Sequence, residues 1–571
     1  MAVCLLAALG CTSPTDVGID AGDGEPDAAG IEPTAVAAPV LLPCPPGWRE
    51  DSALDGVSTC EPWPAEGPIA CGGDEVQLPG EAGCGRLGPQ CPADLLPEGL
   101  PADQPVTYVL AGATDGDGSA SRPYGSLTGF AWGGLRPGTI VALGVGSYEA
   151  EVRLPPGVTL WGACVAGTHL STTMAADAEG VVTARGAGTG LRHLTIADSP
   201  RPGLWVDGAG IELDVQSVVI TGVQALGVHV LEESLLTARE LVVRGTQGRA
   251  ADGGFGRGLD IEIGATARIA RSVIEGNRSS GVFASGPGAT LVLEDAIIRD
   301  TLGEMRDSTN GAGLVAQAGA NVDVARSVIE GNREAGVFGR SAGTSLTLEH
   351  VLIRDTNGRE SDGYYGRGVN VQEGSAAQLA RVFIDRSRDS GLLANQRGSL
   401  LVLEDVVVRE TLDPEAGDGV GRGLSAQLGA TIEADRITIA GTHGLGVLAY
   451  GLGTTVDLAD VAVRDTRPRL CAETTCRDEA AGMAIGDFSD ASLTAQRFAI
   501  DDASLCGVQI AHDGQVDLTD GEISRCGIGV CVQNLGYDYE RLTTRVRFRA
   551  NDVNLQDTDL PVPDPTSPLG R

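Results

Sequence analysis

Three segments of the sequence share a pattern in which an Asp-Gly pair is followed by Gly-Arg-Gly, with aromatic residues between them in two of the three. They read Asp252-Gly-Gly-Phe-Gly-Arg257-Gly, Asp362-Gly-Tyr-Tyr-Gly-Arg367-Gly and Asp418-Gly-Val-Gly-Arg422-Gly, and a fourth, related segment keeps Asp307. Such side chains, repeated along one surface, would bind a polymeric ligand through charge and hydrogen bonds. The alternative is turn chemistry, in which Asp-Gly and Gly-Arg-Gly shape the chain and each Arg pairs with a neighbouring Asp. We favour the turn interpretation, and the candidate ligand-binding residues are Asp252, Arg257, Asp307, Asp362, Tyr364, Tyr365, Arg367, Asp418 and Arg422.

A catalytic site would need a cluster of acids or bases that occurs once, because cleavage of a polysaccharide uses a unique carboxylate pair or abstracting base. Asp501 and Asp502 are adjacent, but they directly follow the apolar centre of a repeat, where a turn is expected. His443, in Gly-Thr-His-Gly, has no acidic pair beside it. The sequence therefore predicts no catalytic residue, and metal-ligand spacing is absent from His169, His193, His229 and His512. A structural calcium ion remains an alternative only where several Asp side chains converge, because the sequence contains no EF-hand pattern.

The composition limits the partners of the protein. The 571 residues include 41 Lys plus Arg against 77 Asp plus Glu, a net charge of −36, and none of the basic residues is Lys. Nucleic-acid binding and docking on anionic lipid through a polybasic patch both need the opposite sign of charge. Schiff-base chemistry is excluded because it needs a Lys amine. Aromatic residues make up only 4% of the chain, which leaves few rings for stacking on sugars.

From about residue 200 the sequence repeats itself. Ala270-Arg-Ser-Val-Ile-Glu-Gly-Asn277 recurs identically at 325–332, and each repeat has a central aliphatic residue. Between Val243 and Val463 these central aliphatics are spaced alternately 31 and 24 residues apart. Apolar residues seven and five positions before each one give the period of two that is typical of a short strand with one buried face. The central aliphatics are Ile196, Ile220, Val243, Ile274, Ile298, Ile329, Ile353, Ile384, Val408, Ile439, Val463, Ile500 and Ile523.

Over residues 105–557 this pattern resembles the right-handed parallel β-helix repeat of pectate-lyase-like proteins. The segments Tyr108-Val-Leu, Arg122-Pro-Tyr and Gly157-Val-Thr-Leu-Trp-Gly162 are similar to the opening of such helices in surface proteins. The resemblance implies an all-β fold, a right-handed single-stranded parallel β-helix (a solenoid), in which three short strands per coil stack on the next coil. The long spacings would then place the loops 244–258, 299–313, 354–368, 409–423 and 464–482 along one edge.

Charged residues offer a test of that stacking, because equivalent positions of adjacent coils would lie ~4.8 Å apart. Three positions before the central aliphatics, the residues alternate in sign with one exception, His350: Glu240, Arg271, Asp295, Arg326, His350, Arg381, Asp405, Arg436, Asp460, Arg497 and Asp520. One position after them a second column alternates in the opposite phase: Arg244, Glu275, Arg299, Glu330, Arg354, Asp385, Arg409, Ala440 and Arg464. We expect ion pairs between coils in both columns. A polar column three positions after the central aliphatics, which includes Asn277 and Asn332, is expected to bond the backbone of the turns.

The N-terminal part of the sequence indicates export. Residues 1–11 resemble a bacterial lipoprotein signal, which implies lipidation of Cys11, and residues 12–43 are expected to form a flexible acidic tether. Residues 44–104 are expected to form a disulfide-stabilised module, with Cys164 the nearest partner outside it for the odd cysteine. A metal knuckle is disfavoured there because Cys-x-x-Cys and His are both absent. Residues 558–571 are expected to be a flexible tail. The number of disulfide candidates is odd, so at least one thiol is free or forms an intermolecular bond, and a bond between Cys471 and Cys476 would close one loop. The disulfide candidates are Cys44, Cys60, Cys71, Cys84, Cys91, Cys164, Cys471, Cys476, Cys506, Cys526 and Cys531.

These observations favour an exported, lipid-anchored protein of the cell envelope, a monomer with a structural, adhesive or glycan-binding role and no catalysis. Its expected partners are a polysaccharide or another surface protein, with no nucleic acid and with the membrane reached only through the lipid. The alternative is a polysaccharide lyase or glycoside hydrolase of the pectate-lyase-like fold. An enzyme would show a cleft where several acidic or basic side chains meet outside the repeat.

Overall fold

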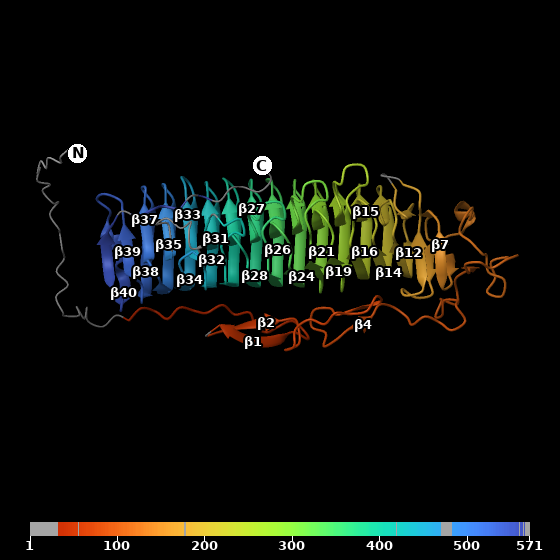
Figure 1. Cartoon of the computed structure of the whole chain (residues 1–571), viewed down its shortest axis with the longest axis horizontal. Helices are drawn as coiled ribbons and strands as arrows, with labels where there is room; N and C mark the ends of the chain where they lie inside the picture. The colour runs from red at the N-terminus through yellow and green to blue at the C-terminus, as the bar shows by residue number, and fades with distance from the viewer. Residues whose placement is uncertain are drawn as a thin grey trace, which may run out of the picture.

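A computed structural model describes residues 32–54, 56–175, 179–417, 419–469, 482–558, 560–563 and 565. The chain winds into a long rod built from two parallel sheets of 21 and 16 strands, and within the described residues the helices are two single 3-10 turns, η1 (Trp132–Gly134) and η2 (Tyr539–Leu542) (Figure 1). The right-handed parallel β-helix predicted from the repeat is thus confirmed. Among these residues, no helix is long and apolar enough to span a membrane.

The strands of the two sheets alternate along the chain. The 21-stranded sheet contains β5 (Val106–Val109), β6 (Ile140–Leu143), β7 (Gly146–Glu149), β9 (Thr159–Gly162), β10 (Thr168–Ser171), β12 (Thr189–Ala197), β14 (Glu212–Thr221), β16 (Leu235–Arg244), β18 (Thr266–Ala270), β19 (Val273–Glu275), β21 (Thr290–Glu294), β22 (Ile297–Arg299), β24 (Asn321–Glu330), β26 (Ser345–Arg354), β28 (Ala376–Asp385), β30 (Leu400–Arg409), β32 (Thr431–Ala440), β34 (Thr455–Thr466), β36 (Ser492–Ala503), β38 (Gln515–Ser524) and β40 (Thr544–Arg549). The 16-stranded sheet contains β8 (Val152–Leu154), β11 (Val182–Ala184), β13 (Leu204–Asp207), β15 (Leu226–Leu231), β17 (Arg257–Glu262), β20 (Ser280–Ser285), β23 (Ala312–Gln317), β25 (Ala335–Arg340), β27 (Arg367–Gln372), β29 (Ser390–Asn395), β31 (Gly421–Gln427), β33 (Gly444–Tyr450), β35 (Met483–Phe488), β37 (Cys506–Ala511), β39 (Ile528–Val532) and β41 (Val553–Asp557).

The long strands of the larger sheet bend at the residue three positions before the central aliphatic. Arg326 and Asp405 at this corner have φ of +48° and +56°, in the left-handed region. The bend divides a ten-residue strand into two straight segments, so each coil has the three short strands that the sequence predicted. Glycine would adopt this conformation with less strain. The charged residues kept at the corner therefore indicate that their side chains have a role.

The central aliphatics stack in register inside the rod. Ile298 pairs with Ile329, which pairs with Ile353, and all three are fully buried. They belong to one apolar core that continues from the first coils to the last. Burial of this column removes the apolar face of every coil from water, which is the main force that holds a solenoid together.

The expected ion pairs between coils are present along most of both columns. In the corner column Arg326 reaches Asp295 at 2.8 Å and Arg436 reaches Asp405 at 2.7 Å, each on the coil before it, whereas Arg381 donates to His350 at 2.9 Å. Arg271 departs from the prediction. It lies in register between Glu240 and Asp295, but its guanidinium pairs with Glu81, 2.7 Å away in the N-terminal segment.

The second charged column and the polar column behave as the sequence suggested. Arg299 pairs with Glu275 at 2.6 Å, and Arg354 pairs with Glu330 at 2.9 Å. In the polar column Asn332 accepts the N–H of Thr301 (3.1 Å) and donates to the carbonyl of Ile298 (3.0 Å), one coil earlier. The amide thereby replaces the hydrogen bonds that a buried turn would otherwise lack.

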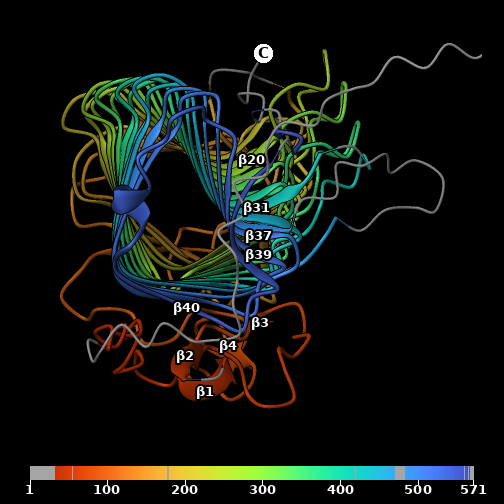
Figure 2. The ribbon, with the colours of Figure 1, turned by 90° about the vertical axis from the view of Figure 1, so that its left-hand side faces the viewer.

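Residues 44–104 pack against the outside of the larger sheet. They contain two hairpins, β1 (Arg49–Leu54) with β2 (Val57–Glu61) and β3 (Glu75–Val76) with β4 (Gly85–Arg86), which run beneath the rod in Figures 1 and 2. Disulfides join Cys44 to Cys60, Cys71 to Cys84 and, between this segment and the β-helix, Cys91 to Cys164.

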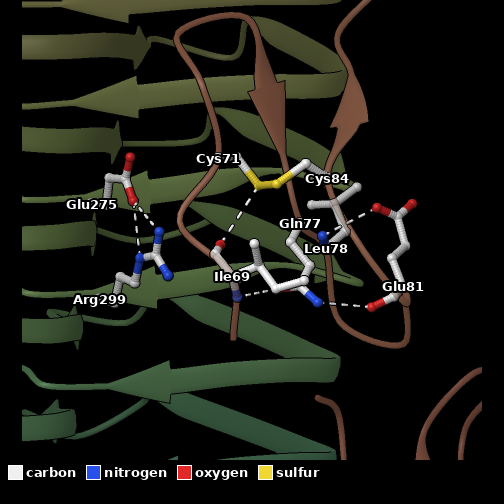
Figure 3. The surroundings of a disulfide bond; sticks show 8 residues. All are labelled: Ile69, Cys71, Gln77, Leu78, Glu81, Cys84, Glu275 and Arg299. Carbon is white, nitrogen blue, oxygen red and sulfur yellow. Dashed lines mark hydrogen bonds and ion pairs between the residues drawn. A yellow bond between two sulfur atoms is a disulfide. The ribbon is translucent and has the colours of Figure 1, made fainter. Parts of the chain in front are cut away.

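The N-terminal segment contacts the rod through apolar side chains and through charged groups. Leu41, Trp63, Leu78 and Leu87 cover a column of outward-facing residues, one position before the central aliphatics: Val219, Val242, Val273, Ile297, Val328, Leu352, Phe383 and Val407. Beyond this covered stretch the same column reads Thr438, Ala462, Ala499 and Glu522. Figure 3 shows the second hairpin beside the charged pair of Glu275 and Arg299, with Glu81 accepting the N–H of Leu78 (3.2 Å).

Residues 32–43, expected to be part of a flexible tether, instead lie along the rod as an extended segment, which we call the strap. The N–H groups of Thr34, Ala37 and Val40 donate to carboxylates of the corner column at 2.8, 3.0 and 2.8 Å. The composition of the strap prevents it from folding alone, as predicted, but the rod supplies the missing partners. The prediction needs correction for these twelve residues, while 12–31 and Cys11 lie outside the described residues.

Candidate functional site

The long loops form a closely contacting row on one side of the rod. They follow β16, β22, β26 and β30, and they gather at one side of the end-on view in Figure 2. Neighbouring loops are bonded to each other: Ser361 N donates to Ser308 O, and Ala416 N donates to Gly363 O, both at 3.0 Å. The loops of this row therefore hold one another in place through their backbones and form a rigid row.

The acidic residues singled out in these loops bond within their own turns. Asp252 accepts two hydrogen bonds from Arg249 (2.6 and 3.1 Å), which, with the Gly254 N–H, lower the pKa of Asp252 to about 2. Asp362 pairs in the same way with Arg359, whose Nε lies 3.1 Å from Oδ1. Asp307 accepts the N–H and the hydroxyl of Thr309 at 3.0 and 2.7 Å. Asp418 lies outside the described residues.

The arginines of the shared pattern turn toward the smaller sheet. Arg257 lies 3.0 Å from Asp260, while Arg367 and Arg422 lie 2.7 and 3.2 Å from the same carboxylate, that of Asp389. Their partners are thus carboxylates of the sheet and its turns, rather than the Asp of the loop pattern. Tyr365 stacks between Arg359 and Arg367 (4.8 and 4.7 Å), and Tyr364 is 41% exposed.

A second set of arginines, which the sequence analysis did not single out, fastens the loops. Arg278, Arg333 and Arg388 stand four positions after central aliphatics, two coils apart, and each donates to a loop carbonyl, at 3.1, 3.2 and 3.2 Å. Their recurrence at 55-residue intervals was the available signal. Beside them Glu334 is 6% exposed, and burial raises its pKa to about 7 although Arg359 lies 3.7 Å away.

One charged cluster on the smaller sheet consists of side chains that do not recur from coil to coil. His229 Nδ1 and Asp260 Oδ2 are 3.0 Å apart, Arg257 holds the other oxygen of Asp260, and the ring of Trp205 lies 4.3 Å from that of His229. Burial, followed by the nearby charge of Asp260, raises the pKa of Glu262. Asp260 can orient the imidazole as an acid or base. The residues 229 and 260 are 31 apart, one long coil, so the coil spacing could have revealed the pair.

An open hollow of about 530 Å³ lies at the first coils, beside the edge strand β8. One wall is aromatic, with the rings of Phe130 and Trp132 4.8 Å apart. The residues around the hollow are Phe130, Ala131, Trp132, Gly133, Glu151, Arg153, Pro155, Pro156 and Arg185.

Charged residues around the hollow belong to a network of guanidinium and carboxylate groups. Arg153 lies 2.6 Å from Glu179 and lowers its pKa through that hydrogen bond, Arg185 also contacts Glu179, and Arg201 lies 2.9 Å from Glu151. Arg153 and Arg185 remain half-exposed, so their forked N–H groups face solvent. Aromatic rings and such donors around one hollow suit a ring-shaped ligand with polar edges.

The remaining candidates are structural or outside the described residues. Cys506 and Cys531 form a disulfide, and Cys526 is a buried free thiol whose pKa is raised by burial. Cys471 and Cys476 lie outside the described residues. In the described ranges, no group of three or more His, Cys, Asp or Glu side chains could hold a metal ion.

Comparisons with known proteins add only solved structures. No family model matches the chain, and no curated protein matches it. Pectate lyase Pel9A is 9% identical, with 58% of this chain and 78% of that chain covered and a TM-score of 0.28. The A-module of the mannuronan C-5 epimerase AlgE4 of Azotobacter vinelandii is 13% identical (74% and 88% covered, TM-score 0.20). The GH87 α-1,3-glucanase of Streptomyces thermodiastaticus is 12% identical (82% and 72%, TM-score 0.26). At these values the likeness carries nothing about activity, and the fold rests on the strand pairing described above.

Proposed function

We propose that the protein is an exported, lipid-anchored surface β-helix without catalytic activity, which binds a glycan in the hollow at its first coils. The observation that carries this proposal is the hollow itself, which is lined by Trp132 and Phe130 together with the half-exposed Arg153 and Arg185. Sugar rings offer both an apolar face and hydroxyl edges, so they match both kinds of lining residue.

The rest of the rod fits a structural role. The charged columns are paired from coil to coil, and the loop residues with known contacts are bonded to the protein itself. Such a surface is rigid, which lowers the entropic cost of presenting a binding site.

The four disulfides among the described residues support export, because disulfides persist in oxidising compartments. The expected lipidation of Cys11 is tested by labelling with palmitate, which should disappear in Cys11→Ser. Retention of the label in that variant would contradict the proposed anchor.

The binding role is tested on a glycan array with the purified full chain. We expect one class of glycan to bind and Trp132→Ala to weaken it about tenfold, the effect of roughly 1.4 kcal/mol. The matched control is Tyr539→Ala, an exposed aromatic residue near the other end of the rod. Equal binding by both variants, with unchanged circular dichroism, would remove the hollow as the site.

The alternative function, a polysaccharide lyase or glycoside hydrolase, is favoured by one observation, the cluster of His229, Asp260 and Arg257. A lyase would release unsaturated sugars, and a hydrolase would release reducing ends, from acidic or neutral polysaccharides. Release that is lost in His229→Gln, with the fold retained, would establish this alternative and overturn the non-catalytic role.

A further inference from the structure

The strap and the corner column share one repeat distance. The three strap donors Thr34, Ala37 and Val40 are three residues apart, and their acceptors Asp520, Asp460 and Asp405 are two coils apart. Two coils span ~9.6 Å, and three residues of an extended or polyproline-like chain span ~9 to 10 Å. An N–H group of the strap therefore meets an acidic corner every third residue without adjustment of either part.

Proline positions in the strap agree with this register. Pro33, Val36 and Pro39 each precede a donor and are less exposed than the residues around them, so they face the rod. Proline lacks an N–H, but none is needed at these positions. The next donor in the series would be residue 43, which is Pro43, and the next corner two coils earlier is His350. The one corner that breaks the alternation of charge thus coincides with the first missing donor.

Burial distinguishes the corners under the strap from the others. The side chains of Asp405, Asp460 and Asp520 are 7, 9 and 6% exposed, whereas that of Asp295, which the strap does not reach, is 37% exposed. Burial acts to raise the pKa of Asp405, but hydrogen bonds from Arg436 and the strap hold it below the ordinary value. The strap is consequently an integral part of the rod surface.

The direction of the strap decides where the N-terminal part of the chain joins the rod. Glu32 lies 3.5 Å from Arg547 in β40, and later strap residues lie on progressively earlier coils (Figure 1). Whatever precedes residue 32, including Cys11, is therefore connected at the last coils. The hollow lies at the opposite end, roughly 70 Å away for 16 stacked strands.

The last coils also differ in charge from the rest of this acidic protein. Residues 525–557 contain five Arg against four acidic residues, Asp538, Glu540, Asp552 and Asp557. Arg545 and Arg547 in β40 keep 47 and 43% of their side chains exposed although each has a carboxylate partner. This end of the rod is close to neutral, so a negatively charged membrane surface repels it less than it repels the acidic flanks.

We propose that the strap orients the rod on its membrane: the last coils face the anionic headgroups of the bilayer that holds Cys11, and the hollow points away from it. This inference rests on the proposed lipid anchor. The surface that meets the membrane is the end of the solenoid formed by β40 and β41. The glycan bound by the hollow would then belong to the surroundings of the cell.

The test measures energy transfer from a dye on the protein to acceptor lipids. Full-length acylated protein is placed in vesicles of phosphatidylcholine with phosphatidylglycerol, in a background with Cys471→Ser and Cys476→Ser. The dye is attached through Leu535→Cys near the last coils or through Met174→Cys near the first, both at exposed positions. We expect strong transfer from position 535 and none above background from position 174. Equal transfer from both positions, or the reverse order, would overturn the proposal.

Two variants separate the strap from other causes. Asp405→Ala with Asp460→Ala and Asp520→Ala should release the strap and reduce the difference between the two dye positions, with circular dichroism unchanged. Asp295→Ala, the matched control in the same column, should leave the difference intact. A difference that survives release of the strap would show that the strap does not set the orientation.

Failure of the anchor and failure of the orientation remain distinguishable. Mass spectrometry of the protein reports whether the acyl group is present. If it is absent, a polyhistidine tag ahead of residue 12 attaches the chain to nickel-chelating lipid, and the two dye positions are compared in the same way. The orientation is then accepted or rejected without the lipid anchor.

Discussion

A buried carboxyl group near the C-terminal end should make the stability of the rod depend on pH. Asp487 in β35 is fully buried, and it stands in register with Ala449 and Ile510, whose side chains are in the core. One carboxyl oxygen accepts the N–H of Gln515 at 2.9 Å, and the other has no partner. Burial raises the pKa of Asp487 from 3.8 to about 7.

The sign of the effect follows from the raised pKa. Between pH 4 and 7 the folded chain holds a proton on Asp487 that the unfolded chain has released, so stability falls as pH rises through this range and is constant above it. A difference between 3.8 and about 7 corresponds to roughly 4 kcal/mol, at about 1.4 kcal/mol for each pH unit. Asp487→Asn removes the ionisation and keeps the size of the side chain.

The assay compares the wild type with Asp487→Asn by hydrogen exchange of β35 and β37 between pH 4 and 8, corrected for the intrinsic dependence of exchange on pH. The opening free energies of the two proteins should agree near pH 4, and the variant should gain up to roughly 4 kcal/mol by pH 7.5. Because the comparison is a difference, titration of other groups cancels. A constant difference across this range, or a variant less stable than the wild type at pH 7.5, would refute the reasoning.

Three further outcomes are expected. Asn332→Ala should destabilise the rod by about 2 to 3 kcal/mol in denaturant unfolding, because it leaves a buried N–H and a carbonyl unpaired. The control Asn321→Ala, on the exposed face, should cost less than about 0.5 kcal/mol. Equal effects of the two variants would contradict the role of the polar column. Leu352→Asp should detach the N-terminal hairpins while the β-helix stays folded, seen as rapid proteolysis before residue 104, and a resistant product would argue against apolar docking. Cys91→Ser with Cys164→Ser opens a loop of 73 residues and should cost about 4 kcal/mol by the chain-entropy estimate, measured by denaturant unfolding under oxidising conditions; no change in midpoint would mean that packing alone holds this segment.

The coils were predictable from sequence because a parallel β-helix places residues one coil apart in direct contact. A spacing of 31 and 24 residues therefore gave both the stack of Ile298 on Ile329 and the ion pair of Arg326 with Asp295. The same arithmetic would have found His229 beside Asp260, had it been applied to the smaller sheet.

The contacts of the N-terminal segment could not be read from periodicity. A strap that bonds through its backbone leaves little trace in its own side chains, so its composition suggested a flexible tether. The signal lay in the rod: the outward column reads Val328, Leu352 and Phe383 where it is covered, and Thr438 beyond that stretch. Apolar residues on a face that should meet water indicate a cover.

The loop row shows a second limit of the sequence. The pattern of Asp and Arg in the loops was visible, but their partners depend on turns one or two coils away. Arg367 pairs with Asp389, a residue of a different coil. The spacing in the sequence determines at which coil a residue lies. Which residue a loop side chain contacts across the rod depends on how the loop packs.

The bond between Thr34 and Asp520 joins residues that are 486 positions apart in the chain. During synthesis the strap emerges early, but its last acceptor is made only after nearly all coils. A chain truncated before β38 would lack this acceptor, and its strap would keep only the bonds to Asp460 and Asp405. The terminal coils of a solenoid can unfold independently of the middle coils. The bond between Thr34 and Asp520 links the N-terminal part of the chain to the last coils and so protects them against this local unfolding.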